Sequence, residues 1–529
     1  MRNFQLPGRS PVFGCHGAVA TSHPLATQVA ADILKSGGNA IDAAVASAAT
    51  LSVVEPQSTG IGGDCFALCA INGKVPPVAI NGSGYAPAAA KPEWFSENNI
   101  TNIDSDSPHA VTVPGAVRTW EKLISDYGTR SLGELLKPAI NYARDGYVVS
   151  PRVSVDWKNN QEKLSGCDNA SRIFLKEGAP PDAGTIHKQP ELADTLELIS
   201  REGADILYEG CLAEELVTYL RSLGSLMTVD DFSSFTPKYV NPIYTNYRGY
   251  DVYECPPNGQ GVIALLMLKI LSGYDAKELD PLGVDRFHLE AEIAKLAYRD
   301  RSIFLADPDK VEVPLEYLLS DSHAEELRSK ISMRKAISNL SITDKFNHRD
   351  TVYLATVDSR GNFVSFINSL FHPFGSGLCS PKSGIIFQNR GSSFSLDKNH
   401  MNCIAGHKRP MHTIIPGILS KNNSAIMAFG VMGGHYQACG HMHILSNLID
   451  YDMDIQEALD FPRGFSFEDS YDLESTIPHS VASGLQDRGH KINWVEEGIG
   501  GGQIVSMDLA SGVISGASEP RKDGVALAW

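Results

Sequence analysis

The pattern of the sequence changes at about residue 350, and this change limits the fold more than any other feature. From about residue 113 to residue 340 the spacing of apolar side chains is mainly helical. After a polar stretch over 341–350, residues 351–358 and 363–368 alternate between apolar and polar side chains, as two strands joined by a turn do. We therefore expect an α+β fold, with a helix-rich first part and a sheet-rich second part.

Several expected elements have clear ends. A helix over 24–36 begins with a proline in its first turn and is followed by two glycines. A helix over 40–54 is apolar on all sides, and such a helix belongs inside a large fold. The other expected helices cover 132–147, 191–202, 214–223, 261–271, 284–304, about 435–450 and 455–461. The other expected strands cover 65–71, 250–254, 384–388, 413–419, 425–430, 503–507 and 512–515.

Composition narrows the class of protein. Of the 529 residues 43% are hydrophobic, which is enough for a large core and too many for a disordered chain. No low-complexity linker divides the sequence, so that one large domain or two interlocked halves fit equally well. The net charge of −17 disfavours nucleic acids and anionic membrane surfaces as partners. Chemistry on a small molecule is the remaining default.

The sequence also bears on the compartment and on bound metals. Its first residues lack the apolar run of a secretory signal, and no stretch of about 18 apolar residues could span a bilayer. The nine cysteines are scattered, and the four-residue spacing of Cys65 and Cys69 fits neither a zinc knuckle nor a redox pair. We expect a cytoplasmic protein with reduced cysteines and with no metal or cofactor.

Three patterns resemble common sites but lack the context that those sites need. The glycine-rich residues 498–502 precede an expected strand, whereas a dinucleotide loop links a strand to a helix. His435, His441 and His443 fall on one expected helix, where alternate positions point about 200° apart, and no carboxylate joins them at ligand spacing. No Gly-x-Ser-x-Gly elbow lies between a strand and a helix, so that a serine hydrolase of that type is not expected.

Thr351 stands at the start of the sheet-rich part, directly after the polar stretch. Inside a chain the hydroxyl of threonine is a weak nucleophile because no base lies beside it. At an N-terminus the free α-amine, with a pKa near 8, can accept that proton. Such a site arises only when the bond between Asp350 and Thr351 is cut. By position alone, Thr351 is an ordinary strand threonine.

Short motifs give Thr351 a second interpretation. They lie at 37–44, 60–64, 113–117, 247–250, 298–301, 350–358, 361–362, 374–377, 408–410, 433–434, 458–463 and 516–521. In this order they resemble the γ-glutamyltransferase family of N-terminal-nucleophile (Ntn) hydrolases over nearly the whole chain. Each motif is weak alone, and about ten in register are specific. The resemblance implies an Ntn αββα sandwich with a helix-rich N-terminal part.

The resemblance also implies a mechanism. Self-cleavage after Asp350 would give a helix-rich large subunit (1–350) and a sheet-rich small subunit (351–529) that begins with the catalytic threonine. The two fragments would remain together as a heterodimer, and association of two such heterodimers is left open. Thr351 would then attack a small-molecule amide, and water or an acceptor amine would release the acyl group.

Three further positions match the family's catalytic residues. Gly433 and Gly434 correspond to the pair of backbone N–H groups that stabilises the oxyanion. Ser369 stands where the family usually has a second threonine that bonds to the nucleophile. Because serine keeps the hydroxyl, this role is expected to survive.

The residues that bind glutamate in the family are replaced. Ser83 stands in place of the arginine that binds the α-carboxylate, Phe371 in place of an asparagine, and Ser393 in place of the aspartate that pairs with the α-ammonium. His412 and Thr413 replace a pair of serines. An arginine grips a carboxylate with two oriented hydrogen bonds, which a serine cannot do.

We therefore expect an altered substrate pocket, shaped by Tyr85, Phe371, Arg390 and His412, with Ser393 and Thr413 beside them. The leading interpretation is a self-cleaving amidohydrolase or acyltransferase that acts on a small-molecule amide. An oxamate amidohydrolase or an acylase for another non-glutamyl group stays open, as does a γ-glutamyl enzyme that holds glutamate differently. An inactive family member that serves as a binding protein is the alternative from another class.

Overall fold

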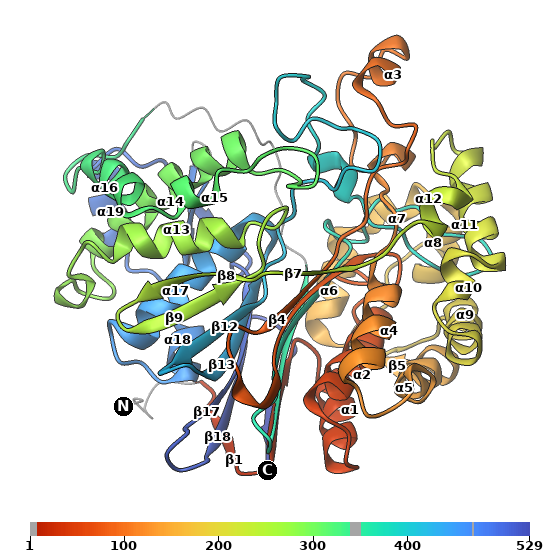
Figure 1. Ribbon diagram of the computed structural model, residues 1–529, viewed down its shortest axis with the longest axis horizontal. Helices are drawn as coiled ribbons and strands as arrows, with labels where there is room; N and C mark the ends of the chain where they lie inside the picture. The colour runs from red at the N-terminus through yellow and green to blue at the C-terminus, as the bar shows by residue number, and fades with distance from the viewer. Residues whose placement is uncertain (1–7, 339–350, 468–469) are drawn as a thin grey trace.

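Two seven-stranded antiparallel sheets lie face to face between two layers of helices in the computed structural model, which describes residues 8–338, 351–467 and 470–529 (Figure 1). The first sheet has the order β1 (Val12–Gly14), β18 (Ile514–Ser518), β17 (Gly501–Met507), β13 (Ser424–Met432), β12 (Gly417–Lys421), β9 (Tyr250–Glu254), β8 (Ile243–Tyr247). The second has the order β19 (Val525–Ala528), β2 (Gly17–Thr21), β10 (Val352–Asp358), β11 (Phe363–Ser369), β3 (Asp64–Ala70), β4 (Val78–Gly82), β7 (Lys238–Val240). The expected αββα sandwich is confirmed.

Helices cover the outer face of each sheet. On the second sheet lie α1 (Pro24–Lys35), α2 (Ala40–Val54) and α4 (Ala116–Tyr127); on the first lie α13 (Gly261–Leu271), α17 (Gln437–Ile449) and α18 (Ile455–Asp460). The others are α3 (Pro92–Glu97), α5 (Leu132–Asp145), α6 (Pro151–Asn159), α7 (Gln161–Ser165), α8 (Asp168–Phe174), α9 (Pro190–Glu202), α10 (Asp205–Tyr208), α11 (Cys211–Ser222), α12 (Val229–Ser233), α14 (Val284–Phe304), α15 (Leu315–Leu318), α16 (Asp321–Ser329) and α19 (His479–Asp487). Two small sheets join β14 (Gly464–Phe467), β15 (Ser470–Glu474) and β16 (Ile492–Val495), and β5 (Tyr147–Val148) and β6 (Ile186–His187). Among the described helices, none has both the length and the apolar composition needed to cross a membrane.

Helix α2 is the buried helix that the sequence predicts, with the same ends. All 15 of its residues are buried. The Asn39 side chain caps the first turn, while the Asp42 carboxylate accepts the backbone N–H of Asn39. The Thr356 hydroxyl of β10 donates to the Ala40 carbonyl at 2.8 Å. The helix therefore helps to fix the strand that begins directly after Thr351.

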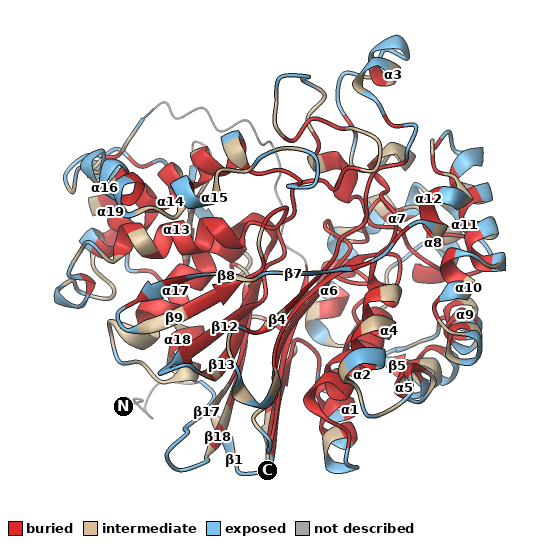
Figure 2. Ribbon diagram, viewed as in Figure 1, coloured by how far each residue is buried: buried red, intermediate tan, exposed pale blue. Residues whose placement is uncertain are grey.

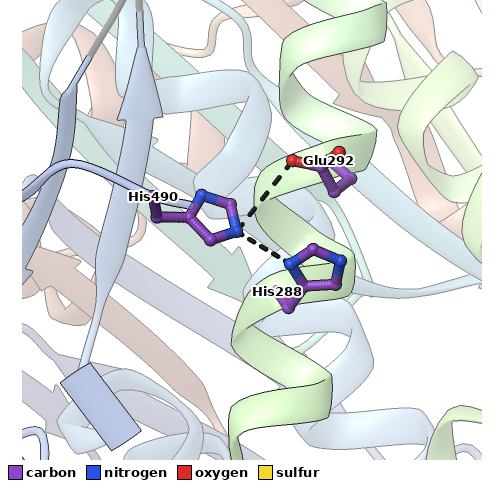
Figure 3. Close-up of side chains that lie close together, drawn as sticks. All are labelled: His288, Glu292 and His490. Atoms are coloured by element: carbon purple, nitrogen blue, oxygen red, sulfur yellow. Dashed lines mark hydrogen bonds and ion pairs between the residues drawn. The ribbon is translucent and has the colours of Figure 1, made fainter. Parts of the chain in front are cut away.

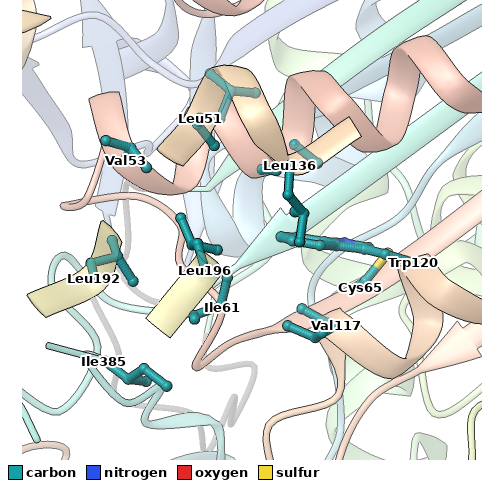
Figure 4. Close-up of a cluster of buried hydrophobic side chains, with 14 of the residues drawn as sticks. Leu51, Val53, Ile61, Cys65, Val117, Trp120, Leu136, Leu192, Leu196 and Ile385 are labelled. Carbon is teal, nitrogen blue, oxygen red and sulfur yellow. The ribbon is translucent and has the colours of Figure 1, made fainter. Parts of the chain in front are cut away.

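The apolar core consists of clusters that lie between the layers. Figure 2 shows that the two sheets and the helix faces against them are largely buried. Side chains from both sheets, including Phe66, Tyr353 and Ile418, pack between them. A second cluster lies between the second sheet and its helices, with Trp120 of α4 beside Cys65 of β3 (Figure 4). Burial of each large apolar side chain contributes about 1.5–3 kcal/mol, so that the strand ends project from a rigid frame.

Most expected elements are confirmed, and two strands are not as expected. Residues 384–388 form no strand, and only one bridge, between Cys379 and Ile386, is present there. The strand expected over 413–419 begins only at Gly417. The first part of the chain also contains more strands than its helical spacing indicates. It supplies β2, β3, β4 and β7 to the second sheet and β1, β8 and β9 to the first, so that the parts before and after residue 350 interleave.

His23 caps helix α1 as a neutral imidazole. Its Nδ1 accepts the backbone N–H of Leu25 at 3.2 Å, and its Nε2 lies 2.9 Å from the Ser150 hydroxyl oxygen. Burial lowers the pKa of His23 to about 4. Protonation would remove the capping acceptor and place a buried cation at the positive end of a helix.

We expect His23 to make the protein less stable as the pH falls below about 6.5. In this range the unfolded state binds a proton that folded His23 excludes. The contribution of His23 to the free energy of unfolding falls by about 1.4 kcal/mol for each unit by which the pH is lowered, until the pH nears the pKa of His23 in the folded protein. In His23→Asn, which keeps a capping acceptor, the fall in melting temperature between about pH 7.5 and pH 5.5 should be smaller. The exposed His479 provides the control variant, His479→Asn, and equal slopes in wild type and His23→Asn would contradict the prediction.

Candidate active site

A row of residues crosses one end of the second sheet. The pairing of β10 with β11 places Val352 opposite Asn368, so that Thr351 lies opposite Ser369. Ser369 in turn pairs with Asp64 at the start of β3. Side chains directly opposite each other on neighbouring strands are close enough to interact, and Thr351 Oγ1 lies 3.2 Å from Ser369 Oγ. Both residues are buried, with at most 1% of their surface exposed.

Gly433 and Gly434 follow β13 in the facing sheet. A Cβ atom added at Gly430 would lie 2.3 Å from the Tyr353 ring, so that the end of β13 packs over the start of β10. The φ angles of Gly433 and Gly434 are +121° and +57°, and L side chains rarely adopt such a conformation. The Gly434 carbonyl accepts a hydrogen bond from Gln260 Nε2 at 3.1 Å. The glycine pair therefore lies at the same end of the sandwich as the start of β10.

A buried ion pair supports the glycine pair. Arg463 and Glu519 are both fully buried, and their nearest nitrogen and oxygen lie 2.7 Å apart. The Glu519 carboxylate also accepts the backbone N–H of Gly502 at 2.7 Å. A Cβ atom added at Gly433 would lie 2.9 Å from Gly500 Cα. Glu519 therefore fixes the start of β17, and the residue just before that strand is in close contact with the glycine pair.

The imidazole of His412 and the carboxyl group of Asp64 form a buried hydrogen bond. The Asp64 carboxylate accepts hydrogen bonds of 2.9 Å each from the Gly84 backbone, Gln388 Nε2 and His412 Nε2. His412 Nδ1 accepts the backbone N–H two residues further on, so that its Nε2 carries the proton. Burial lowers the pKa of His412 and raises that of Asp64 to about 7, and the Arg390 charge counteracts the rise. Both nitrogens of His412 are therefore engaged by the protein.

Arg390 is linked to Thr351 by a series of contacts through Phe371 and Ser369. The residue is fully buried, and its Nη1 donates to Thr413 Oγ1 at 2.9 Å. Its guanidinium carbon lies 3.8 Å from the centre of the Phe371 ring. The Phe371 backbone N–H donates to Ser369 Oγ at 2.9 Å. Burial lowers the pKa of Arg390 to about 9, and the Asp64 charge counteracts it, so that the guanidinium remains charged at neutral pH.

The other residues predicted for the pocket bond elsewhere. The Tyr85 hydroxyl lies 2.9 Å from Ser234 Oγ. Ser393 Oγ lies 2.8 Å from the Arg390 carbonyl oxygen and 3.0 Å from the Met411 carbonyl oxygen, and its one proton is shared between them. These two hydroxyls therefore support the surrounding loops. Asp350, on the other side of the expected cleavage site, lies outside the described residues.

Sequence reasoning missed two amides that join the loops of the site. Asn258 Nδ2 donates to Ser83 Oγ at 3.0 Å and to the Pro410 carbonyl at 2.7 Å. Gln260 Nε2 donates to the Thr413 carbonyl at 2.8 Å as well as to Gly434. Both residues follow β9 and the pair of prolines at 256–257. Polar amides in such a turn were the available signal.

The three histidines of helix α17 and the turn before it have separate partners. His441 Nδ1 lies 2.6 Å from a Glu254 carboxylate oxygen, and His443 Nδ1 lies 2.9 Å from one of Glu290. His435 Nδ1 accepts a hydrogen bond of 2.8 Å from Arg301 Nη1. The two carboxylates come from β9 and α14, so that the histidines do not share a ligand set.

One group within the described ranges has three side chains of the metal-ligating kind, His288, Glu292 and His490 (Figure 3). His288 Nδ1 lies 2.8 Å from His490 Nε2. The Glu292 carboxylate already accepts hydrogen bonds of 2.7 Å each from Lys295 Nζ and the Ile337 backbone. An ammonium group at this distance opposes a metal cation, and these contacts instead fasten the segment around Ile337 to α14.

Comparison with known proteins identifies the family. A sequence model described as Gamma-glutamyltranspeptidase matches residues 26–529. The glutathione hydrolase-like YwrD proenzyme of Bacillus subtilis is 35% identical over 528 residues, which cover 98% of this chain and 99% of that protein. The oxamate amidohydrolase proenzyme of Klebsiella pneumoniae is 31% identical over 530 residues, with 97% and 98% covered. The crystal structure of cephalosporin acylase from Bacillus halodurans has a TM-score of 0.93 and 40% identity, and the match covers 100% of this chain and 99% of that one. The chain therefore belongs to the gamma-glutamyltranspeptidase family of amide hydrolases and acyltransferases.

Proposed function

We propose that the chain cuts itself between Asp350 and Thr351 and then cleaves a small-molecule amide through an acyl-Thr351 intermediate. The observation that carries the proposal is the placement of Thr351 at the head of β10, with its Oγ1 3.2 Å from Ser369 Oγ. The Gly433–Gly434 pair at the end of the facing strand supports it. The names of the relatives, which include proenzymes, point the same way.

Self-cleavage creates the base that the nucleophile needs. Thr351 Oγ1 attacks the carbonyl carbon of residue 350, and the peptide nitrogen leaves as the free α-amine of Thr351. Water then hydrolyses the ester that joins the two fragments. The new amine has a pKa near 8 and can take the hydroxyl proton in later cycles.

Amide cleavage then follows in two steps. The Thr351 hydroxyl attacks the substrate carbonyl, its proton passes through the α-amine to the leaving nitrogen, and an acyl ester remains. Water, or an acceptor amine in a transfer reaction, attacks this ester and releases the acyl group. The Gly433 and Gly434 N–H groups stabilise the oxyanion of both steps, and Ser369 Oγ orients the nucleophile.

The interleaved sheets support a heterodimer of fragments 1–350 and 351–529. Strand β10 is hydrogen-bonded to β2 in the second sheet, and β12 to β9 in the first, so that the cut at residue 350 leaves both sheets shared. We also place the protein in the cytoplasm. All nine cysteines are free thiols, Cys15 and Cys211 among them exposed, and exposed thiols persist best in a reducing compartment.

The pocket favours an acyl group other than glutamyl. The Ser83 hydroxyl is bonded to Asn258 Nδ2 at 3.0 Å, and a serine has no charge for an α-carboxylate. Ser393 likewise offers no charge for an α-ammonium. An oxamate amidohydrolase or a dedicated acylase therefore fits better than a γ-glutamyl enzyme.

Intact mass measurement of the purified wild-type protein tests the self-cleavage. We expect two fragments, one that ends at Asp350 and one that begins at Thr351, which elute together on size exclusion. The same sample should hydrolyse simple anilides of short acids. A single full-length chain without amide turnover would instead indicate an inactive binding protein.

A further inference from the structure

Arg390 has hydrogen-bonding capacity that the described protein does not use. Its side chain is completely buried. Nη1 is bonded to Thr413 Oγ1 at 2.9 Å, but Nε and Nη2 have no hydrogen-bond partner among the described residues. Buried N–H groups are nearly always paired in folded proteins, and an unpaired one costs about 1–3 kcal/mol or more when it is charged. The two free groups on one guanidinium edge therefore require an explanation.

The nearest acidic side chain does not supply it. No carboxylate of the described residues lies within ion-pair distance of Arg390, although the Asp64 charge is near enough to raise the pKa of the guanidinium. Asp64 itself accepts three hydrogen bonds, from Gly84, Gln388 and His412. Its carboxylate is thus committed to other donors, and the guanidinium edge stays open to another acceptor.

The position of Arg390 points to the substrate as that acceptor. The guanidinium carbon lies 3.8 Å from the centre of the Phe371 ring. Phe371 has an unusual φ of +81°, and its backbone N–H donates to Ser369 Oγ at 2.9 Å, next to Thr351. A side chain held in a rare backbone conformation beside a reactive group often serves the site. Two contacts thus separate the guanidinium from the residue that touches Thr351.

We propose that Nε and Nη2 of Arg390 bind a carboxylate on the acyl group, and that the substrate is the monoamide of a short dicarboxylic acid. An arginine edge with two parallel N–H groups matches a carboxylate geometrically. With Ser393 uncharged and Asp64 occupied, the described residues of the site offer no acidic partner for an α-ammonium. The acyl group is therefore a plain dicarboxylic acid rather than glutamate. This inference rests on the proposed amide-cleaving function.

A set of matched p-nitroanilides tests the carboxylate and the ammonium of the acyl group separately. The glutaryl and succinyl anilides carry the carboxylate, the pentanoyl anilide replaces the carboxylate of glutaryl by a methyl group, and the γ-glutamyl anilide adds an ammonium. We expect wild type to prefer the better dicarboxylic anilide over the pentanoyl anilide by about 10²-fold in kcat/KM, and over the γ-glutamyl anilide as well. In Arg390→Gln this preference over pentanoyl should fall to within a few fold. The control Arg201→Gln, at an exposed arginine, should keep the wild-type ratio.

A binding measurement keeps this inference separate from the proposed function. Glutarate and succinate alone, titrated calorimetrically, should bind wild type more tightly than Arg390→Gln, whether or not any anilide is cleaved. Failure of wild type to cleave every anilide, with the acids still bound, would reject the amide-cleaving function only. Equal losses for charged and uncharged anilides in Arg390→Gln, or equal binding of the acids to both proteins, would overturn the role of Arg390.

Discussion

Thr351→Ala should leave the chain uncut and lower amide turnover on the order of 10⁵-fold, as removal of a nucleophile does in other acyl-transfer enzymes. The physical reason is that one hydroxyl serves both reactions. Without it neither the free α-amine nor the acyl ester can form. Intact mass reports the first reaction, and release of p-nitroaniline from the preferred anilide reports the second.

The same strand provides the control for this variant. Thr356 is also buried in β10, and its hydroxyl donates to the Ala40 carbonyl at 2.8 Å. Thr356→Val removes that hydrogen bond and should still cut itself after residue 350. Thr351→Ser, which keeps a hydroxyl on the same backbone, should also be cut. Cleavage at this bond in Thr351→Ala would assign self-processing to another group.

The elements that the sequence predicts best are those whose signals are local. Helix α2 has its capping residue, its apolar run and its stop within 39–56 of the sequence, and each of these acts through neighbouring residues. By contrast, β2 and β19 are short, and β2 pairs with β10 and β19 from far along the chain. No periodicity within five residues specifies such a partner.

The strand predicted over 384–388 is wrong because this segment is buried without regular strand pairing. Residues 384–387 are apolar, and all of 384–388 are buried, as a central strand is. Their backbone groups bond irregularly, with Ser380 N donating to the Ile385 carbonyl and Phe387 N to the Leu378 carbonyl. A short apolar run predicts burial, whereas the conformation depends on the partner that the fold supplies.

In the candidate site, too, some residues could be predicted from the sequence and others could not. Resemblance to a family could indicate Thr351, Ser369 and the glycine pair, because motifs keep their order in the chain. It could not indicate that Arg390 is bonded by Thr413 on one side only, because that follows from the packing of loops far apart in sequence. The motifs at 458–463 and 516–521 illustrate this as well, since they meet through Arg463 and Glu519.

Gly433→Ala tests the proposed oxyanion site. The glycine has a φ of +121°, and an added Cβ would lie 2.9 Å from Gly500 Cα, closer than carbon atoms pack. We expect the backbone to shift and its N–H to leave the oxyanion, lowering kcat by about 10²–10³-fold per cleaved molecule. Gel densitometry gives the cleaved fraction, and anilide hydrolysis gives the rate.

Gly512→Ala is the matched control, because it reproduces the backbone strain without the collision. Gly512 has a φ of +73°, and no atom lies within 4 Å of an added Cβ. Both variants therefore lose the freedom of glycine at positive φ, which costs each about 1 kcal/mol of stability or somewhat more. Only Gly433 also collides beside the start of β10. Equal turnover in the two variants would mean that the N–H groups at 433–434 do not face the reacting carbonyl, and a large loss confined to Gly433→Ala would place them there.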